Sequence, residues 1–274
     1  MPHLTKHCLA ARYRYWSWVS CIPANVRRWN FVFFLLLFCH SVAADPPKTG
    51  AFRLQQNLNQ LLGASAASSY ESMIPANELI QWEVYVPPTY DASRPAGLMV
   101  YISPTASGKI PKSWRPLMNQ HNLIWVAARR SGNKIDTQRR MIYAVLSVAL
   151  INKNYKINSK RIYLSGFSGG GRVASMLGVH YPMLFRGGIY NCGANFWGES
   201  SPQNIDQLKR NRFVFITGRK DFNLEDTKKV YRAYKRAGIR NSLLSVSPIM
   251  GHKNPNKKMF DHAIKFLDGI PLKQ

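Results

Sequence analysis

The sequence has few cysteines, few acidic residues and no apolar run long enough to cross a membrane. Only four cysteines occur in 274 residues, and 13 acidic residues stand against 38 lysines and arginines, which gives a formal net charge of +25. The main apolar stretch, residues 31–39, is about half of the 18 or more residues that a membrane span requires. We therefore expect no permanent membrane anchor.

The first 44 residues have the order of a secretory signal peptide. A basic pair at 27–28 precedes the apolar run at 31–39, and the small residues 41–44 follow it. We expect cleavage after Ala43 or Ala44, and export to the periplasm or the cell exterior. The part before position 27 is long for a signal peptide, so a translated upstream extension is an alternative explanation of it.

The scarcity of cysteine bears on how the exported chain is stabilised. Three of the four cysteines precede the expected cleavage site, so the remaining chain keeps only Cys192 and has no internal disulfide. Its stability must come from a packed core, for which about 230 residues suffice. We divide the chain into the signal segment 1–44, a lead segment 45–80 and a main domain 81–274.

The basic excess survives removal of the signal segment. Residues 1–44 hold five basic residues and no acidic one, so the formal charge falls only from +25 to +20. The basic residues are spread over the whole chain without a zinc-finger, RNP or helix-turn-helix signature, so we expect no specific nucleic-acid binding. A solvated basic surface is the simplest interpretation, and an anionic or polymeric substrate is compatible with it.

The most informative motif surrounds Ser168. Gly166, Ser168 and Gly170 form a G-x-S-x-G pattern between an apolar strand-like run at 161–165 and a helical pattern at 170–181. The small flanking residues allow a sharp turn that exposes the serine hydroxyl. The sequence therefore predicts a strand, an elbow and a helix, with Ser168 as a nucleophile.

The same glycines allow a second interpretation. Gly169, Gly171 and Ala174 fit the G-x-G-x-x-A fingerprint of dinucleotide-binding proteins. That fingerprint needs an acidic residue about 20 positions later to hold a ribose. Residues 187–195 contain no Asp or Glu, so we disfavour a nucleotide cofactor.

A nucleophilic serine needs a histidine to take its proton and an acid to orient that histidine. Asp221 follows the apolar run 213–217, and His252 follows the strand-like run 242–249. Both candidates thus lie just past a predicted strand, in the chain order Ser, Asp, His that is typical of the elbow architecture. The competing candidates that lack such a position include Asp206, Glu225, Asp226, His121, His180 and His262.

The developing oxyanion of an acyl-transfer reaction needs two hydrogen-bond donors. We expect one to be the backbone NH of Gly169, which follows the nucleophile. The other should come from the loop after the predicted strand 98–102, where Pro104 has no NH to donate. Thr105 is our first choice for the second donor and Ser103 is the alternative.

These segments together resemble the α/β-hydrolases of the polyhydroxybutyrate depolymerase-like esterase group, over roughly residues 81–270. Besides the elbow, the resemblance rests on residues 101–104, 131–133, 157–161, 218–223 and 250–255. It implies ester hydrolysis through an acyl-enzyme, with Ser168 as nucleophile, His252 as acid and base, and Asp221 as its orienter. Many relatives carry a His-Gly pair where this chain has Ser103 and Pro104, and that departure concerns the second oxyanion donor.

Apolar runs alternate with amphipathic segments in the order of an α/β fold with a mostly parallel, doubly wound sheet. The predicted strands are 82–86, 98–102, 123–128, 161–165, 187–191, 213–217 and 243–248, and the predicted helices are 137–152, 170–181, 224–237 and 257–268. Only about twenty residues separate the strands at 187–191 and 213–217, too few for a large cap domain. Phe196 and Trp197 in this interval, with Phe167 beside the nucleophile, are our candidates for the substrate pocket.

The sequence thus favours an exported serine carboxylic-ester hydrolase. Its histidines and acids show no metal-ligand spacing, so we expect neither a metal nor a cofactor. Two alternatives stay open: a serine peptidase that uses the same three residues, and a catalytically silent binding protein on the same scaffold.

Overall fold

A computed structural model describes residues 47–195 and 204–271. The expected signal segment, 1–44, lies outside the described residues. The elements are β1 (Gly50–Gln56), α1 (Leu58–Leu62), α2 (Ala64–Ala67), η1 (Ser68–Tyr70), β2 (Ile80–Val86), β3 (Ala96–Ile102), η2 (Lys112–Trp114), α3 (Arg115–Gln120), β4 (Leu123–Ala128), α4 (Thr137–Asn154), β5 (Ile157–Phe167), α5 (Gly169–His180), β6 (Gly187–Asn191), α6 (Ile205–Arg210), β7 (Arg212–Lys220), α7 (Leu224–Arg236), β8 (Ser242–Gly251) and α8 (Lys257–Leu267).

The strands form one eight-stranded sheet in the order β1-β2-β4-β3-β5-β6-β7-β8. β1 and β2 are antiparallel to each other, and β2 is antiparallel to β4. The remaining pairs, from β4 through β3 to β8, are parallel. Every residue of β3, β4 and β6 is buried, as expected for parallel strands that are covered on both faces. The predicted mostly parallel α/β sheet is confirmed.

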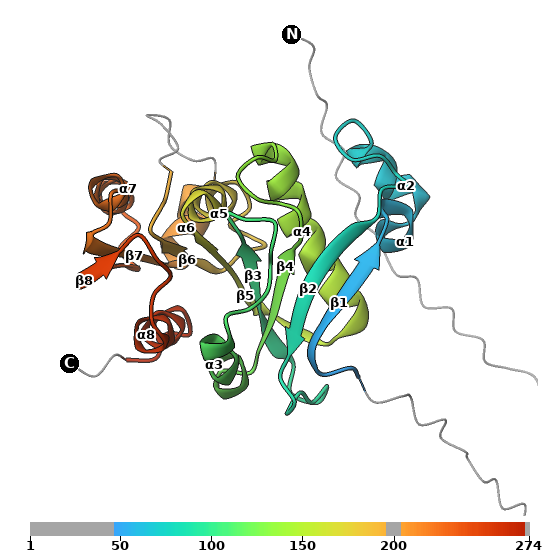
Figure 1. Ribbon diagram of the computed structural model, residues 1–274, viewed down its shortest axis with the longest axis horizontal. Coiled ribbons are helices and arrows are strands. Elements are labelled where there is room, and N and C mark those ends of the chain that lie inside the picture. Colours follow the sequence, from blue (N-terminus) through green and yellow to red (C-terminus); the bar gives the residue numbers. More distant parts are fainter. Residues whose placement is uncertain (1–46, 196–203, 272–274) are drawn as a thin grey trace, which may run out of the picture. The chain divides into compact units, whose positions relative to one another are not determined.

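Helices cover both faces of the sheet, and each face has its own hydrophobic core (Figure 1). Successive side chains of β3 point to opposite faces of the sheet. Leu98 and Val100 enter the core beneath α4, α5 and α7. Met99 and Tyr101 enter the core beneath α3 and α8. The second core contains Trp114 of η2. Its ring stacks on the ring of Phe260 in α8, with 3.9 Å between the two centroids. The sheet is thereby held rigidly between two packed layers.

The lead segment 45–80 contributes to the same sheet. Its strand β1 pairs with β2 along seven residues, from Gly50 opposite Val86 to Gln56 opposite Ile80. Between β6 and β7, the described residues include one short helix, α6. Among the helices in the described part of the chain, none is both long and apolar enough to cross a membrane.

Parallel strands bring their carboxyl ends to one edge of the sheet. β3, β5, β7 and β8 end at that edge, and Ser103, Ser168, Asp221 and His252 each follow directly after one of these strands. Ligands of open α/β sheets bind along this edge, because loops from several strands meet there. The topology thus gathers four residues that are far apart in sequence.

Candidate active site

Ser168 occupies the sharp turn between β5 and α5. Its backbone has φ 54° and ψ −123°, a conformation that costs energy for any residue with a side chain. The turn is tight: a Cβ at Gly166 would overlap the carbonyl of Gly170, and a Cβ at Gly170 would overlap the carbonyl of Ile102. The glycines of the motif are therefore required by close backbone approach, and the strained turn presents the serine hydroxyl above the sheet edge.

Ser168, His252 and Asp221 form a continuous hydrogen-bonded chain. The Oγ of Ser168 lies 2.9 Å from Nε2 of His252, and Nδ1 of His252 lies 2.8 Å from Oδ1 of Asp221. These distances are within the range for a nucleophile, its base and the group that orients the base. The three residues singled out from their order and their positions after strands are brought together.

The carboxylate of Asp221 is fully buried, and both of its oxygens accept hydrogen bonds. Its Oδ2 accepts a hydrogen bond from Thr217 Oγ1 at 2.7 Å, and its Oδ1 accepts one from the backbone NH of Asn223 at 3.0 Å. Burial alone would raise the pKa of Asp221, but the hydrogen bonds from Thr217, Asn223 and His252 outweigh it and hold the pKa below its ordinary value. Asp221 is therefore ionised in the neutral range and stabilises positive charge on His252.

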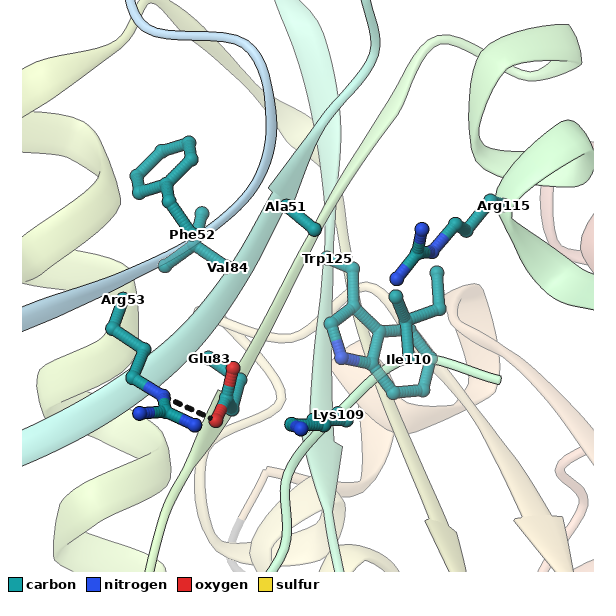
Figure 2. Close-up of a pocket in the computed structure, with 9 residues that line it drawn as sticks. All are labelled: Ala51, Phe52, Arg53, Glu83, Val84, Lys109, Ile110, Arg115 and Trp125. Atoms are coloured by element: carbon teal, nitrogen blue, oxygen red, sulfur yellow. Dashed lines mark hydrogen bonds and ion pairs between the residues drawn. The ribbon is translucent and has the colours of Figure 1, made fainter. Parts of the chain in front are cut away.

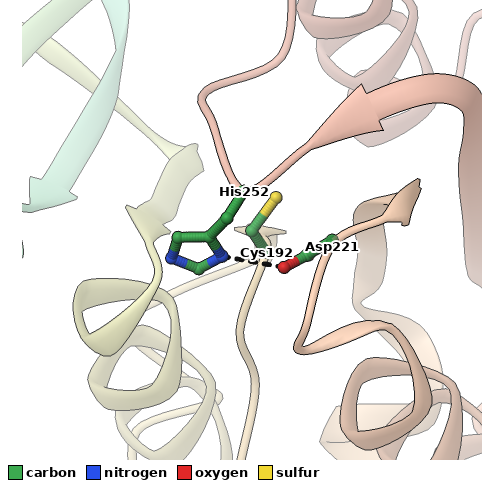
Figure 3. A group of neighbouring side chains, drawn as sticks. All are labelled: Cys192, Asp221 and His252. Atoms are coloured by element: carbon green, nitrogen blue, oxygen red, sulfur yellow. Dashed lines mark hydrogen bonds and ion pairs between the residues drawn. The ribbon is translucent and has the colours of Figure 1, made fainter.

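Cys192 lies beside this pair and makes the cluster a conceivable metal site (Figure 3). One ligand atom from each of Cys192, Asp221 and His252 lies within 4.8 Å of the other two. Burial and the neighbouring Asp221 charge raise the pKa of the Cys192 thiol to about 12, so the thiolate that would ligate a metal is disfavoured. The thiol instead donates to the carbonyl of Lys253 at 3.4 Å, and the donor set fits a triad better than a metal centre.

The ring of His252 lies between two aromatic side chains. Phe222 stacks on it with 4.0 Å between centroids, and Phe167 lies at 4.9 Å with a tilt of 39°. Phe222 is 78% exposed although it is large and apolar. Sequence analysis assigned no role to Phe222, and its position directly after Asp221 was the signal that could have identified it.

The region expected to form the oxyanion hole combines the start of α5 with the loop after β3. Gly169 is the first residue of α5, so its NH has no partner one turn earlier in the helix. The NH of Thr105 donates to Ser103 Oγ at 3.1 Å, and it can serve an oxyanion only if that bond is exchanged. The amide of Asn133 packs against Gly169 so closely that a Cβ there would overlap its Oδ1.

The loop after β3 is held by a buried cation. Arg140 of α4 donates from Nε to the carbonyl of Ser131 at 2.9 Å and from a terminal nitrogen to the carbonyl of Ser103 at 3.0 Å. Arg140 is only 4% exposed, so these bonds satisfy a charge that would otherwise be costly to bury. Sequence analysis did not identify this residue, because its effect depends on the approach of α4 to two loops.

The remaining candidates lie elsewhere or outside the described residues. Phe196 and Trp197, expected to line the pocket, fall in the segment 196–203 that the structure does not describe. His121 contacts Asp261 at 2.7 Å, away from the three residues above. The ion pairs of the other acids are Asp206 with Lys209, Glu225 with Lys228, and Asp226 with Arg172.

Several solved protein structures are similar to this chain in fold. No protein-family model matches the chain, and no curated protein matches it in sequence. Among solved structures, it is similar to a thermostable esterase, with a TM-score of 0.51 and 15% identity over 70% of this chain and 56% of that one. A ferulic acid esterase matches with a TM-score of 0.59 and 13% identity, over 80% of this chain and 99% of that one.

Dipeptidyl peptidase 4 from Porphyromonas gingivalis is also similar, with a TM-score of 0.53 and 15% identity, over 71% of this chain and 34% of that one. The chain thus spans about half the length of the thermostable esterase (56%) and about a third of the peptidase (34%). The similarity in sequence is low in each case, so the likeness concerns the fold. With its single mostly parallel sheet of eight strands, the chain has the α/β-hydrolase fold.

Proposed function

We propose that this protein is a serine hydrolase that cleaves carboxylic esters through an acyl-enzyme. The observation that carries the proposal is the hydrogen-bonded chain from Ser168 Oγ through His252 to Asp221, at 2.9 Å and 2.8 Å. A buried, ionised acid and a strained serine turn are costly to keep. Their combination at the loop edge of an α/β-hydrolase sheet is explained by acyl transfer and has no evident structural purpose.

The geometry supports a two-step reaction. Nε2 of His252 takes the proton of Ser168 as Oγ attacks the ester carbonyl, and the oxyanion that forms is stabilised by the NH of Gly169 at the start of α5. His252 then returns the proton to the departing alcohol. A water molecule, deprotonated by the same nitrogen, then attacks the acyl carbonyl. The bond to Oγ breaks, His252 gives the proton to Oγ of Ser168, and the acid leaves. Asp221 holds Nδ1 of His252 protonated throughout.

The exposed ring of Phe222 favours a bulky or polymer-borne substrate. It forms an exposed apolar surface against the ring of His252. Among the candidate substrates, such a surface suits a polyester of the polyhydroxybutyrate type or an ester-decorated polysaccharide better than a short acyl ester. The basic excess of the chain also agrees with an anionic polymer.

A peptidase that uses the same three residues is the second candidate. It is favoured by the similarity of the fold to that of dipeptidyl peptidase 4 from Porphyromonas gingivalis. The two candidates differ in the bond that is cleaved and share Ser168, so one substrate panel separates them. Export through the signal segment 1–44 is part of our proposal and is tested by sequencing the N-terminus of the secreted protein.

The test compares the chain with Ser168→Ala on p-nitrophenyl esters of increasing acyl length, a polyester film and aminoacyl anilides. Ser113→Ala is the matched control, because Ser113 is exposed and lies on η2. We expect ester cleavage by the wild type and by Ser113→Ala, and none by Ser168→Ala. Cleavage of anilides alone supports the peptidase, and retained cleavage by Ser168→Ala contradicts both candidates.

A further inference from the structure

A cavity lies at the opposite edge of the sheet from Ser168. It has a volume of about 390 Å³ and is formed where β6 and β7 begin, next to α6 and the end of α8. Because a water molecule occupies about 30 Å³ in the liquid, this space is large enough for a polyatomic ligand. None of the triad residues lines it.

The charges around this cavity have one sign. Its lining includes Lys160, Arg186, Arg210 and Arg212 and contains no carboxylate. Within residues 47–195 and 204–271, none of these four cations makes an ion pair with an acid. Like charges gathered in a concave site repel one another and concentrate a positive potential there.

The carboxylate of Asp268 lies near the cavity, but Arg161 already neutralises it. Asp268 accepts two hydrogen bonds from Arg161, both at 2.8 Å, and a third at 2.9 Å from Tyr163, which lines the cavity. A bidentate arginine pair of this kind leaves the carboxylate with little capacity to neutralise further cations. The four cations of the cavity therefore have no counter-ion among the described side chains.

The cavity is built on rigid structure. The NH of Arg186 donates to Ile162 at 2.8 Å, and Asn211 donates to the carbonyl of Phe185, the residue before Arg186, at 3.0 Å. The guanidinium of Arg212 lies over the ring of Phe266, 5.7 Å from its centroid. These contacts fix the backbone at Arg186 and the guanidinium of Arg212 before any ligand arrives.

Arg186 combines an unpaired charge with a buried donor atom. Its Nε atom is buried and finds no hydrogen-bond partner among the described residues. A buried donor without an acceptor costs free energy, and in native structures such an atom commonly faces an ion or water. An oxyanion in the cavity would supply the counter-charge that the Arg186 guanidinium lacks.

Another basic cavity, of about 300 Å³, differs in having a carboxylate among its lining residues (Figure 2). Figure 2 shows Arg53 of β1 paired with Glu83 of β2. Nε of Arg53 lies 2.9 Å from Oε1 of Glu83. The same carboxylate lies 3.2 Å from Arg129. That cavity therefore contains its own counter-ion, and the cavity at Arg186 contains none.

We infer that the cavity at Arg186 binds a multivalent oxyanion of the phosphate or sulfate type. The planar forks of Arg186, Arg210 and Arg212 match the geometry of such oxyanions, which accept paired N–H donors, and Lys160 adds a point charge. The site lies at the opposite edge of the sheet from the triad, so it binds its ligand independently of ester cleavage. The oxyanion can be a free ion or a group carried by a polymer, since the recognition chemistry is the same.

Isothermal titration calorimetry with inorganic pyrophosphate at constant ionic strength tests this inference. We expect saturable binding with one site per chain, and a rise in Kd of about 10-fold or more in Arg186→Gln and in Arg210→Gln, because each removes a charge-assisted hydrogen bond. Arg210 is exposed, so its substitution leaves the core intact. Titration with long-chain polyphosphate distinguishes the sources: tighter binding that still depends on Arg186 identifies a polymer-borne group, and equal binding identifies a free ion.

Arg236→Gln is the matched control. It removes the same charge from an exposed site on α7 that does not line the cavity. We expect the Kd of Arg236→Gln to equal that of the wild type, and Ser168→Ala to bind pyrophosphate unchanged. The absence of saturable binding, or an equal loss of affinity in Arg236→Gln and Arg186→Gln, would overturn the inference.

Discussion

Thr217 donates its hydroxyl hydrogen to Oδ2 of Asp221 at 2.7 Å, while the other oxygen of the same carboxylate faces His252. Both Thr217 and the carboxylate are fully buried, so no water can replace the hydroxyl if it is removed. Thr217 thereby helps to keep Asp221 ionised and aimed at the histidine ring.

We expect Thr217→Val to lower kcat for ester hydrolysis by about 10- to 100-fold, because a hydrogen bond to a charged group contributes about 1.5–3 kcal/mol. The deficit should grow at acid pH, since the pKa of Asp221 rises when the donor is lost. Thr227→Val is the control: Thr227 is equally buried, and its hydroxyl has no hydrogen-bond partner among the described residues. Equal kcat losses in the two variants would refute a specific role for Thr217.

Phe222 should affect catalysis without affecting stability. Because the ring is 78% exposed, Phe222→Ala should leave the free energy of unfolding within about 0.5 kcal/mol of the wild type. Loss of its stacking leaves His252 less firmly positioned, which should lower kcat/KM by about 3- to 10-fold. Ile249→Ala is the control, since Ile249 is 81% exposed. An unchanged kcat/KM in Phe222→Ala would count against the predicted role.

Two glycine substitutions test whether the elbow tolerates a side chain less well than another part of the site does. A Cβ at Gly166 would overlap the carbonyl of Gly170, so Gly166→Ala should displace the nucleophile, abolish activity and cost about 1–3 kcal/mol of stability. At Gly251, beside His252, the nearest atom to an added Cβ is 3.5 Å away, and Gly251→Ala should retain activity. Circular dichroism melting and esterase assays measure both effects. Full activity in Gly166→Ala would contradict the tight elbow.

The low pKa of Asp221 makes a prediction about stability and pH. A carboxyl whose pKa is lower in the folded than in the unfolded state stabilises the fold above its unfolded pKa, which is about 3.9. This contribution is lost as the pH falls through the folded pKa. The wild type should therefore lose its electrostatic advantage over Asp221→Asn as the pH falls below about 4, through the lowered folded pKa. Urea unfolding of both proteins measures the difference, and an advantage that grows on acidification would be inconsistent with this reasoning.

The strands were predictable wherever apolar side chains run along a buried parallel strand. β4 and β6 have the limits expected from sequence, 123–128 and 187–191, because every residue in them is buried. β5 begins at Ile157 rather than at 161, since its first half carries exposed polar side chains that do not form an apolar run. β1 was not predicted: Arg53 and Gln55 are exposed, and its pairing with β2 is long-range.

Some residues of the site were predictable from the sequence and others were not. Ser168, Asp221 and His252 could be singled out because each follows directly after a strand, in an informative chain order. Cys192 and Phe222 also follow strands that end at this edge, but their contacts depend on side-chain packing that no spacing encodes. The contacts of Arg140 with two loop carbonyls require the three-dimensional approach of α4.

The most direct test of the central claim is covalent labelling of the intact chain with an alkyl fluorophosphonate, followed by peptide mass spectrometry. A serine activated by His252 and Asp221 displaces fluoride and forms a stable phosphonyl ester. We predict one adduct on the peptide that contains Ser168, slower labelling in His252→Ala, and none in Ser168→Ala. The absence of an adduct on the folded wild-type chain, or the same adduct in Ser168→Ala, would contradict the account.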